Sequence, residues 1–277
     1  MTFTSFIHRV QRGLSTVELI HTSHPRWPLP PGRPHLSPTV QISVLDSSFN
    51  LLTLAHLVLA NTLPPSPPTG GVTPVTHPFL DDFDARLLLL SPRSADKLLK
   101  PGDATYEQRM EMMVLLAQDL ARTHSRDLHA AQSTTLESTT HESNVAVAII
   151  DEPTFVGKSA LLLDFLRKRV SDLSVITSSP ESPSLYSEPE PPHPSSPSSW
   201  VWTRSSASSR RATTPEEAMN TALHRFLSPT EDDSRIICTR RISKGVSREE
   251  EEKAEILRPD FVRDIAPADQ ISFVDIG

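Results

Sequence analysis

The segment 40–61, VQISVLDSSFNLLTLAHLVLAN, constrains the fold of this chain more than any other part of its sequence. An apolar run rich in β-branched residues, 40–45, predicts a buried strand, and a short polar turn, 46–50, follows it. A helical pattern then begins, with one face shared by Leu54, Leu57 and Val58. The segment therefore predicts a strand that enters a helix through a tight polar turn.

Such a turn favours the binding of phosphate. It brings backbone N–H groups and the positive end of the helix dipole to one point, where an anion is stabilised. His56 lies in the first turn of the expected helix, so its imidazole is expected to face the same point. A histidine beside a phosphate-binding turn indicates chemistry at a phosphorus atom.

The composition limits the class of protein. A length of 277 residues suits one large domain or two small ones, while 37% hydrophobic residues and 26 prolines confine a compact core to part of the chain. The net charge of −7 gives no support for a nucleic-acid partner, and no apolar run reaches the length of a membrane span.

The single Cys238 excludes an internal disulfide and a cysteine-based zinc site, and it fits a reducing compartment. We expect a cytoplasmic or nuclear location. The basic N-terminus, with Arg9 and Arg12, favours a disordered tail over a mitochondrial presequence.

Alternating strand and helix patterns predict an α/β fold with a parallel sheet and right-handed crossovers. Ligands on such sheets bind at the carboxyl ends of the strands, where the turn 46–50 lies. We expect four parts: an N-terminal tail or edge segment (1–37), a Rossmann-like core (38–176), a low-complexity or frame-shifted segment (177–214) and a C-terminal part of the same domain (215–277). Within the core and the C-terminal part, the expected elements are strands at 85–91, 145–150, 235–240 and 270–276, and helices at 103–121 with Asp103 as N-cap, at 158–170, at 215–229 and at 244–257. The segments 62–84 and 122–143 are expected to be loops.

Three stretches resemble a known family. Ser47 to His56, SSFNLLTLAH, is similar to the signature of the nucleotidylyltransferase superfamily, (Gly/Ser)-x-Phe-x-Pro-x-(His/Thr)-x-x-His. The stretches 87–113 and 144–169 follow in the order and spacing of its fungal nicotinamide-nucleotide adenylyltransferase-like branch. The resemblance covers most of residues 38–176 and part of the tail, and it implies a Rossmann-like sheet of the nucleotidylyltransferase type.

The function that this resemblance implies is ATP-dependent adenylyl transfer to nicotinamide mononucleotide, giving NAD and pyrophosphate with Mg²⁺ as cofactor and no resident metal site. The expected partners are thus ATP and a pyridine mononucleotide. His56 would stabilise the transferring phosphate with help from Thr53, which is also a candidate N-cap. The nucleotide-binding residues implied are Ser47, Ser48, Phe49, Asn50, Lys97 and Arg109.

The chain departs from this family at three places. Leu51 and Leu52 replace a Pro-Pro pair and are expected to loosen the turn. Residues 177–214 are a Ser/Pro linker or, as we favour, a segment translated in the wrong frame. A shifted reading of 197–214 allows FLVGLDTLERLLAPRYY, a strand followed by Gly-x-Asp, so the central fourth strand is expected to be lost. The chain also ends before a Ser-Ser-x-x-x-Arg motif that the family uses for ATP phosphates. A catalytically defective nucleotide-binding or partner-binding relative is therefore the alternative.

Two further patterns carry less weight. Gly157-Lys158-Ser159 imitates the end of a phosphate-binding P-loop, but Glu152 stands where the first glycine is required, so we interpret it as a helix start. Thr154 and Ser159 are possible ligand contacts there. The three histidines of the polar segment 122–143 lack the spacing of metal ligands, and a solvated loop is expected.

Overall fold

The structure is a computed structural model of the whole chain. It describes residues 2–29, 40–64, 82–93, 100–131, 144–177, 200–205, 216–228, 231–232, 234–241 and 271–276. Along the chain the elements are α1 (Phe3–Gln11), β1 (Val17–Thr22), β2 (Ile42–Asp46), α2 (Leu54–Ala60), β3 (Ala85–Leu90), α3 (Tyr106–Ala131), β4 (Val145–Ile150), α4 (Phe155–Thr177), β5 (Trp200–Ser205), α5 (Glu216–Leu227), β6 (Ser234–Arg241) and β7 (Ile271–Ile276).

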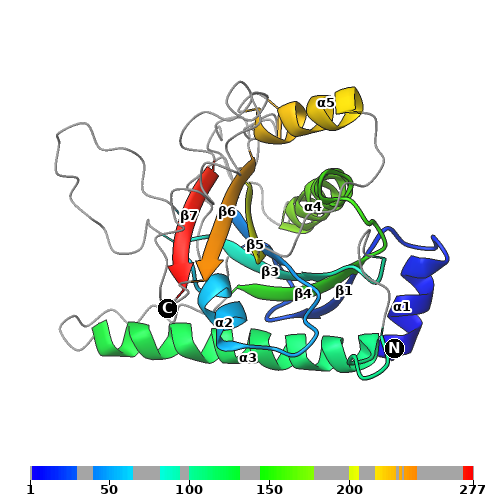
Figure 1. Ribbon diagram of the computed structural model, residues 1–277. Coiled ribbons are helices and arrows are strands. Elements are labelled where there is room, and N and C mark those ends of the chain that lie inside the picture. The colour runs from blue at the N-terminus through cyan, green and yellow to red at the C-terminus, as the bar shows by residue number, and fades with distance from the viewer. Residues whose placement is uncertain are drawn as a thin grey trace, which may run out of the picture.

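A mostly parallel sheet flanked by helices forms the centre of the molecule (Figure 1). Four strands in the order β1-β4-β3-β2 make its mixed part, because β1 runs antiparallel to β4 while the other neighbours are parallel. The strands β5, β6 and β7 continue the sheet beyond β2 in parallel pairing. The predicted α/β class is confirmed, with an antiparallel edge strand added.

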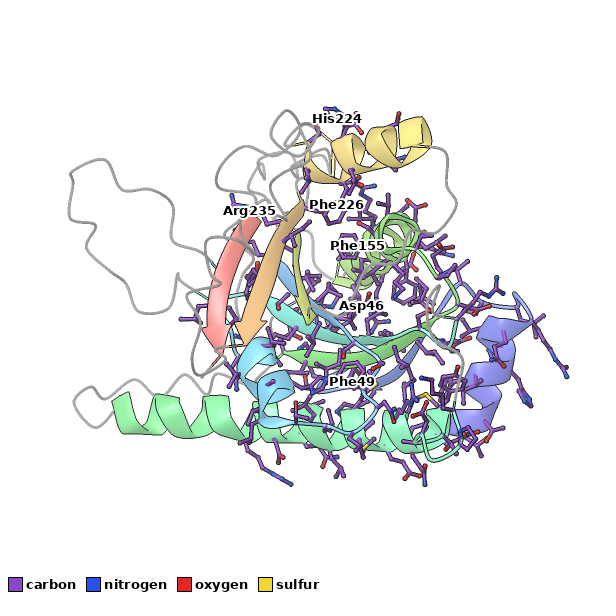
Figure 2. The ribbon with its side chains drawn as sticks, in the orientation of Figure 1. Asp46, Phe49, Phe155, His224, Phe226 and Arg235 are labelled. Carbon is purple, nitrogen blue, oxygen red and sulfur yellow. The ribbon has the colours of Figure 1, made fainter. Side chains whose placement is uncertain are left out.

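Helices cover both faces of the sheet because its central strands are apolar on both sides. Every residue of β3 and of β4 is buried, as their continuous runs ARLLLL and VAVAII require. On one face α1, α2 and α3 pack through a cluster that includes Ile7, Leu59 and Met113. On the other face, α4 and α5 meet, and the Phe155 and Phe226 rings lie edge to face with centroids 4.9 Å apart (Figure 2).

The N-terminal segment belongs to this fold. The helix α1 buries Ile7 and Val10, and β1 forms the edge strand beside β4. Of the two interpretations of residues 1–37, the edge segment agrees with the structure, and the tail is wrong for 3–22. The reason is that the amphipathic stretch of α1 covers the face near β4, and β1 pairs with the free backbone of β4.

The fourth parallel strand is also present, so the expectation that it is lost is wrong. The segment WVWTRS forms β5 between β2 and β6. Aromatic and β-branched residues favour a strand, and ladder hydrogen bonds need only backbone groups. A Gly-x-Asp sequence is therefore not needed to complete the sheet, although WVWTRS does not supply that motif.

The boundaries of two helices differ from those predicted. The helix α3 begins at Tyr106 and continues to Ala131, ten residues into the segment expected to be a polar loop. Its N-cap is Thr105 in a capping box with Gln108, not Asp103: the Thr105 N–H donates to Gln108 Oε1 (2.9 Å) and the Gln108 N–H to Thr105 Oγ1 (3.3 Å). The helix α4 begins three residues earlier and ends seven later than predicted.

The remaining predicted elements are confirmed at 216–227, 234–241 and 271–276. The helix expected at 244–257 lies outside the described residues. Among the helices that the structure describes, none combines the length and the apolar character that crossing a membrane demands.

Candidate phosphate-binding site at the β2–α2 turn

The turn between β2 and α2 has an unusual backbone. Phe49 (φ 44°) and Leu51 (φ 66°) both have φ in the left-handed region. Ser48, which precedes Phe49, and Asn50, which lies between the two, have negative φ. Positive φ values next to negative ones are typical of turns whose successive N–H groups form an anion-binding concavity. No described residue accepts a hydrogen bond from the backbone N–H of Ser48, Phe49 or Asn50. The turn therefore has the donors that phosphate requires.

His56 is fixed in one tautomer by this turn. It is the third residue of α2, and its Nδ1 accepts the backbone N–H of Thr53, the N-cap, at 3.1 Å. The Thr53 hydroxyl also lies 3.0 Å from Nδ1. Because a backbone N–H only donates, Nδ1 carries no proton in the neutral imidazole, and the proton is on Nε2. The Nε2–H donates to Ser47 Oγ at 3.0 Å.

This tautomer decides between two kinds of chemistry. A Ser–His nucleophilic pair needs an unprotonated Nε2 to accept the serine proton, with Nδ1–H bound to an acceptor. In this chain the polarity is reversed, since Nδ1 accepts and Nε2 donates. The arrangement disfavours Ser47 as a nucleophile and favours His56 as a hydrogen-bond donor to an anionic oxygen.

The imidazole is also supported from below. Phe49 is fully buried in the core between the sheet and α3, and its ring centroid lies 5.4 Å from that of His56 (Figure 2). Phe49 therefore supports the histidine, whereas the resemblance implies only that it belongs to the nucleotide-binding turn.

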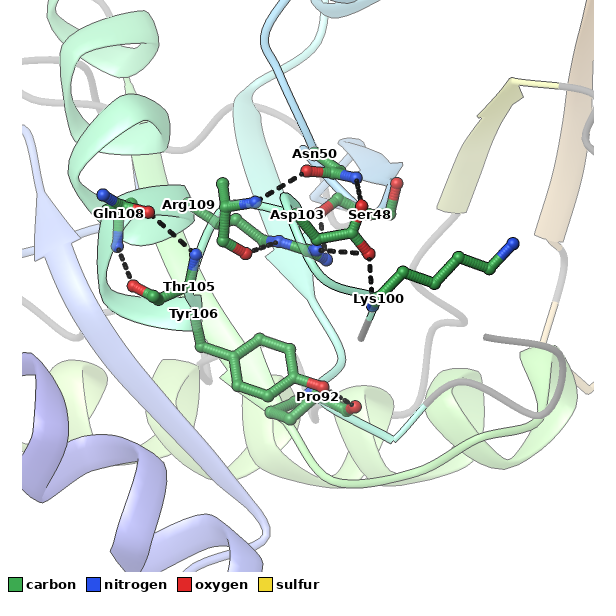
Figure 3. Close-up of polar contacts among 10 residues, drawn as sticks. Ser48, Asn50, Pro92, Lys100, Asp103, Thr105, Tyr106, Gln108 and Arg109 are labelled. Atoms are coloured by element: carbon green, nitrogen blue, oxygen red, sulfur yellow. Dashed lines mark hydrogen bonds and ion pairs between the residues drawn. The ribbon is translucent and has the colours of Figure 1, made fainter. Parts of the chain in front are cut away.

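The turn also forms hydrogen bonds with Arg109 of α3 and with the residues just before this helix (Figure 3). Arg109 donates from Nη1 to the Ser48 carbonyl (3.1 Å) and from Nε to the Ala104 carbonyl (2.9 Å). Asn50 donates to the Asp103 carboxylate (2.7 Å) and accepts the Ala104 N–H (3.1 Å). Arg109 is only 6% exposed, so it contacts the protein backbone rather than standing as a surface cation.

A buried ion pair lies at the end of β2. Lys158 Nζ is 3.0 and 2.9 Å from the two carboxylate oxygens of Asp46, and both side chains are nearly buried. Asp46 lies on the side of the sheet that faces α4 (Figure 2). The pair joins the first turn of α4 to the strand that leads into the Ser47 turn.

Most of the predicted site is therefore assembled. The structure brings together Ser47, Ser48, Phe49, Asn50, Thr53, His56 and Arg109. Lys97 lies outside the described residues. Sequence reasoning missed Asp46, Lys158 and Asp103 as partners, and no local signal identifies them, because the residues joined are 112 and 53 positions apart.

The two leucines have different roles in the turn. Leu52 is partly buried against the core beside α3, whereas Leu51 is 69% exposed at its positive φ. Proline cannot adopt φ of +66°, because its ring fixes φ near −65°. The turn thus differs in conformation from one built on proline at position 51. Arg109 and Asn50 contact the turn through hydrogen bonds, and the expected loosening by the two leucines stays a prediction.

The described residues offer no group of three or more histidine, cysteine, aspartate or glutamate side chains suited to a metal ion. The two carboxylates nearest the turn already have partners, Asp46 in Lys158 and Asp103 in Asn50 and the Lys100 N–H.

Fold and site together define an α/β protein with a donor-lined strand–turn–helix site at the carboxyl end of a central parallel strand. A scan against protein-family models found no match, and searches of curated proteins and of solved structures found no similar protein.

Proposed function

We propose that this chain transfers the adenylyl group of ATP to nicotinamide mononucleotide, forming NAD and pyrophosphate. In this reaction an oxygen of the mononucleotide phosphate attacks the α-phosphorus of ATP, and the bond to pyrophosphate breaks. No covalent bond to the protein forms, so the protein must align the reactants and stabilise charge.

The tautomer of His56 is the observation that carries this proposal. With Nδ1 occupied by the Thr53 N–H, the Nε2–H is available to move from Ser47 Oγ to a non-bridging oxygen of the α-phosphate. A donor already oriented toward developing negative charge lowers the barrier without reorganisation. The amides of Ser48, Phe49 and Asn50 support the same conclusion, since they are candidate donors for a phosphate in the turn that leads into α2.

The choice of acceptor rests on the sequence resemblance alone. The hydrogen-bond geometry of the turn suits any adenylyl transfer, including transfer to nicotinate mononucleotide or to phosphopantetheine. Magnesium bound to the ATP phosphates would supply further charge neutralisation.

An assay of NAD formation from ATP and nicotinamide mononucleotide tests the proposal. We expect His56→Ala to lower kcat about 100- to 1000-fold while ATP still binds, because one donor to the reacting phosphate is removed. His8→Ala, which changes an exposed histidine of α1, is the matched control and should retain full activity. Equal activity of the wild type and His56→Ala would contradict the proposal.

A second candidate is a relative that binds nucleotide without turning it over. The exposed, left-handed Leu51 favours it, since this residue changes the turn from the conformation that a proline would impose. In that case the wild-type chain binds ATP but forms no adenylylated product and releases no pyrophosphate with any of the three acceptors.

A further inference from the structure

The β2–α2 turn is held by Asn50 of the turn itself, by Asp103 of the loop before α3 and by Arg109 in the first turn of α3. Asn50 uses both ends of its amide: Nδ2 donates to Asp103 Oδ1 at 2.7 Å, and Oδ1 accepts the Ala104 N–H at 3.1 Å. The other oxygen of Asp103 accepts the Lys100 N–H at 2.9 Å. Asn50 and the loop before α3 therefore form one hydrogen-bonded unit (Figure 3).

Arg109 provides the second connection. Its guanidinium spans the carbonyls of Ser48 and Ala104, lies 3.9 Å from the Asp103 carboxylate, and stands 5.5 Å from the Tyr106 ring centre. Tyr106 is itself tied to the Pro92 carbonyl by a 2.6 Å hydrogen bond. A buried arginine with this many partners has little freedom to move.

The bond to the Ser48 carbonyl has a consequence for the amides. In a planar trans peptide the C=O and the next N–H point in opposite directions. A Ser48 carbonyl held by Arg109 therefore turns the Phe49 N–H away from α3. Phe49 and Leu51 also adopt φ values that cost about 1–2 kcal/mol each for residues with a side chain, so the turn needs external support to persist.

We propose that Asn50, Asp103 and Arg109 are positioning residues, a clamp that holds the β2–α2 turn in its anion-binding conformation and so sets its affinity for ATP. This inference rests on the proposed function for the identity of the ligand. It assigns to Arg109 a role on the protein backbone in place of direct phosphate binding.

An exchange of the two side chains tests the clamp. Asn50→Asp places two carboxylates against each other, and Asp103→Asn leaves one N–H facing another. In the double variant Asn50→Asp/Asp103→Asn, each hydrogen bond again has a donor and an acceptor. We expect Asn50→Asp to weaken ATP binding about tenfold or more and Asp103→Asn several-fold, with the exchange restoring affinity to within about threefold of wild type.

Isothermal titration with ATP gives the affinities, and thermal melting without ligand verifies that each variant is folded. The exchange keeps a negative charge at position 50, so simple repulsion of phosphate by that charge predicts no rescue. Four equal affinities, or a double variant as weak as the two single effects combined, would overturn the clamp.

Arg109→Lys supplies the second measurement. Lysine keeps the positive charge but cannot span two carbonyls, so a positioning role predicts a loss of ATP affinity close to that of Arg109→Met. Wild-type affinity in Arg109→Lys would overturn that role and favour direct phosphate binding. These binding data are separate from the reaction assay: equal NAD formation by wild type and His56→Ala rejects the proposed function, whereas failed rescue rejects the clamp.

Discussion

Two strand-to-helix turns at the carboxyl edge of the sheet, β2–α2 and β4–α4, use their backbone donors differently. Between β4 and α4, the Glu152 carboxylate accepts from the Thr154 N–H and hydroxyl, and Thr154 in turn accepts the Gly157 N–H at 3.2 Å. A Cβ on Gly157 would collide with that carboxylate. The N-terminus of α4 thus already holds an anion from its own chain.

Between β2 and α2 the situation is the opposite. The first turn of α2 has no acidic residue, and the backbone amides of Ser48, Phe49 and Asn50 donate to no described residue. Its support includes Arg109 of α3 and the hydrogen bonds of Asn50 with the residues just before α3. The comparison shows that the β2–α2 turn keeps backbone donors that no described residue uses, whereas the β4–α4 turn binds its own carboxylate.

Lys158 links the two turns, and its removal is expected to have the largest effect. Lys158→Ala leaves the Asp46 carboxylate nearly buried without a counter-ion, and we expect the free energy of unfolding to fall by about 3–5 kcal/mol. Chemical denaturation measures this change. If Lys158 did not stabilise Asp46 at the end of β2, Lys158→Ala would change the free energy of unfolding no more than a substitution on the exposed face of α4.

The control is the surface pair of Arg167 and Asp164, 4.0 Å apart on the same helix. Arg167→Ala should cost less than about 1 kcal/mol, because exposed pairs contribute little. Asp46→Asn added to Lys158→Ala should recover part of the loss, since the unpaired charge is then removed. If Lys158→Ala lowered the free energy of unfolding by less than about 1 kcal/mol, the Asp46 carboxylate would not depend on Lys158 for its stabilisation.

The two N-cap threonines test the comparison directly, because the same substitution is made at each turn. Thr154→Ala and Thr53→Ala should each lower the free energy of unfolding by about 1 kcal/mol. Only Thr53→Ala should also reduce NAD formation, since Thr53 Oγ1 lies 3.0 Å from His56 Nδ1. Equal effects of both variants on activity would contradict the assignment of the site to the β2–α2 turn.

The central strands and the turn could be predicted from sequence because their signals are local. Continuous apolar runs predicted β3 and β4 to within one residue, and the polar break at 46–50 indicated where the candidate site lies. The position of His56 at the start of α2 also follows from the local pattern.

The rest depends on contacts between distant residues. The edge strand β1 forms because β4 offers an open backbone edge, and β5 forms because β2 and β6 offer two, which the sequence WVWTRS alone does not show. In the same way, Arg109 has the pattern of a surface cation on a helix, and only the packing of α3 against the turn buries it.

Leu51 allows the strain in the β2–α2 turn to be measured. At φ +66° the backbone of a leucine is strained by about 1–2 kcal/mol in the folded state. Glycine has no such strain, but it loses about 0.5–1 kcal/mol more backbone entropy on folding than a residue with a side chain. We therefore expect Leu51→Gly to raise the free energy of unfolding by about 0.5 kcal/mol. Leu115→Gly is the control: this leucine is similarly exposed inside α3, where glycine should lower stability by about 1 kcal/mol. A loss at both positions would mean that the turn is not strained at Leu51.

The smallest expected effect is a pH dependence that distinguishes Asp103 from Asp232. The Lys100 N–H, then the Asn50 amide, and the Arg109 charge lower the pKa of Asp103, so its contribution to stability is present above its unfolded pKa, roughly 3.9. That contribution is lost as the pH falls through the lowered pKa of the folded state. The difference in unfolding free energy between wild type and Asp103→Asn should therefore shrink on acidification.

Burial gives Asp232 the opposite sign. It raises the pKa of this carboxyl, against the opposing charge of Arg225, so the folded state binds a proton more readily than the unfolded state. Wild-type stability relative to Asp232→Asn should consequently decrease as the pH rises through the interval between the two pKa values. Urea denaturation of the three proteins between roughly pH 3 and pH 7 measures both slopes. Parallel slopes for the two variants would show that the hydrogen bonds of Asp103 do not favour its charged form, and so would remove the electrostatic support for the clamp at the β2–α2 turn.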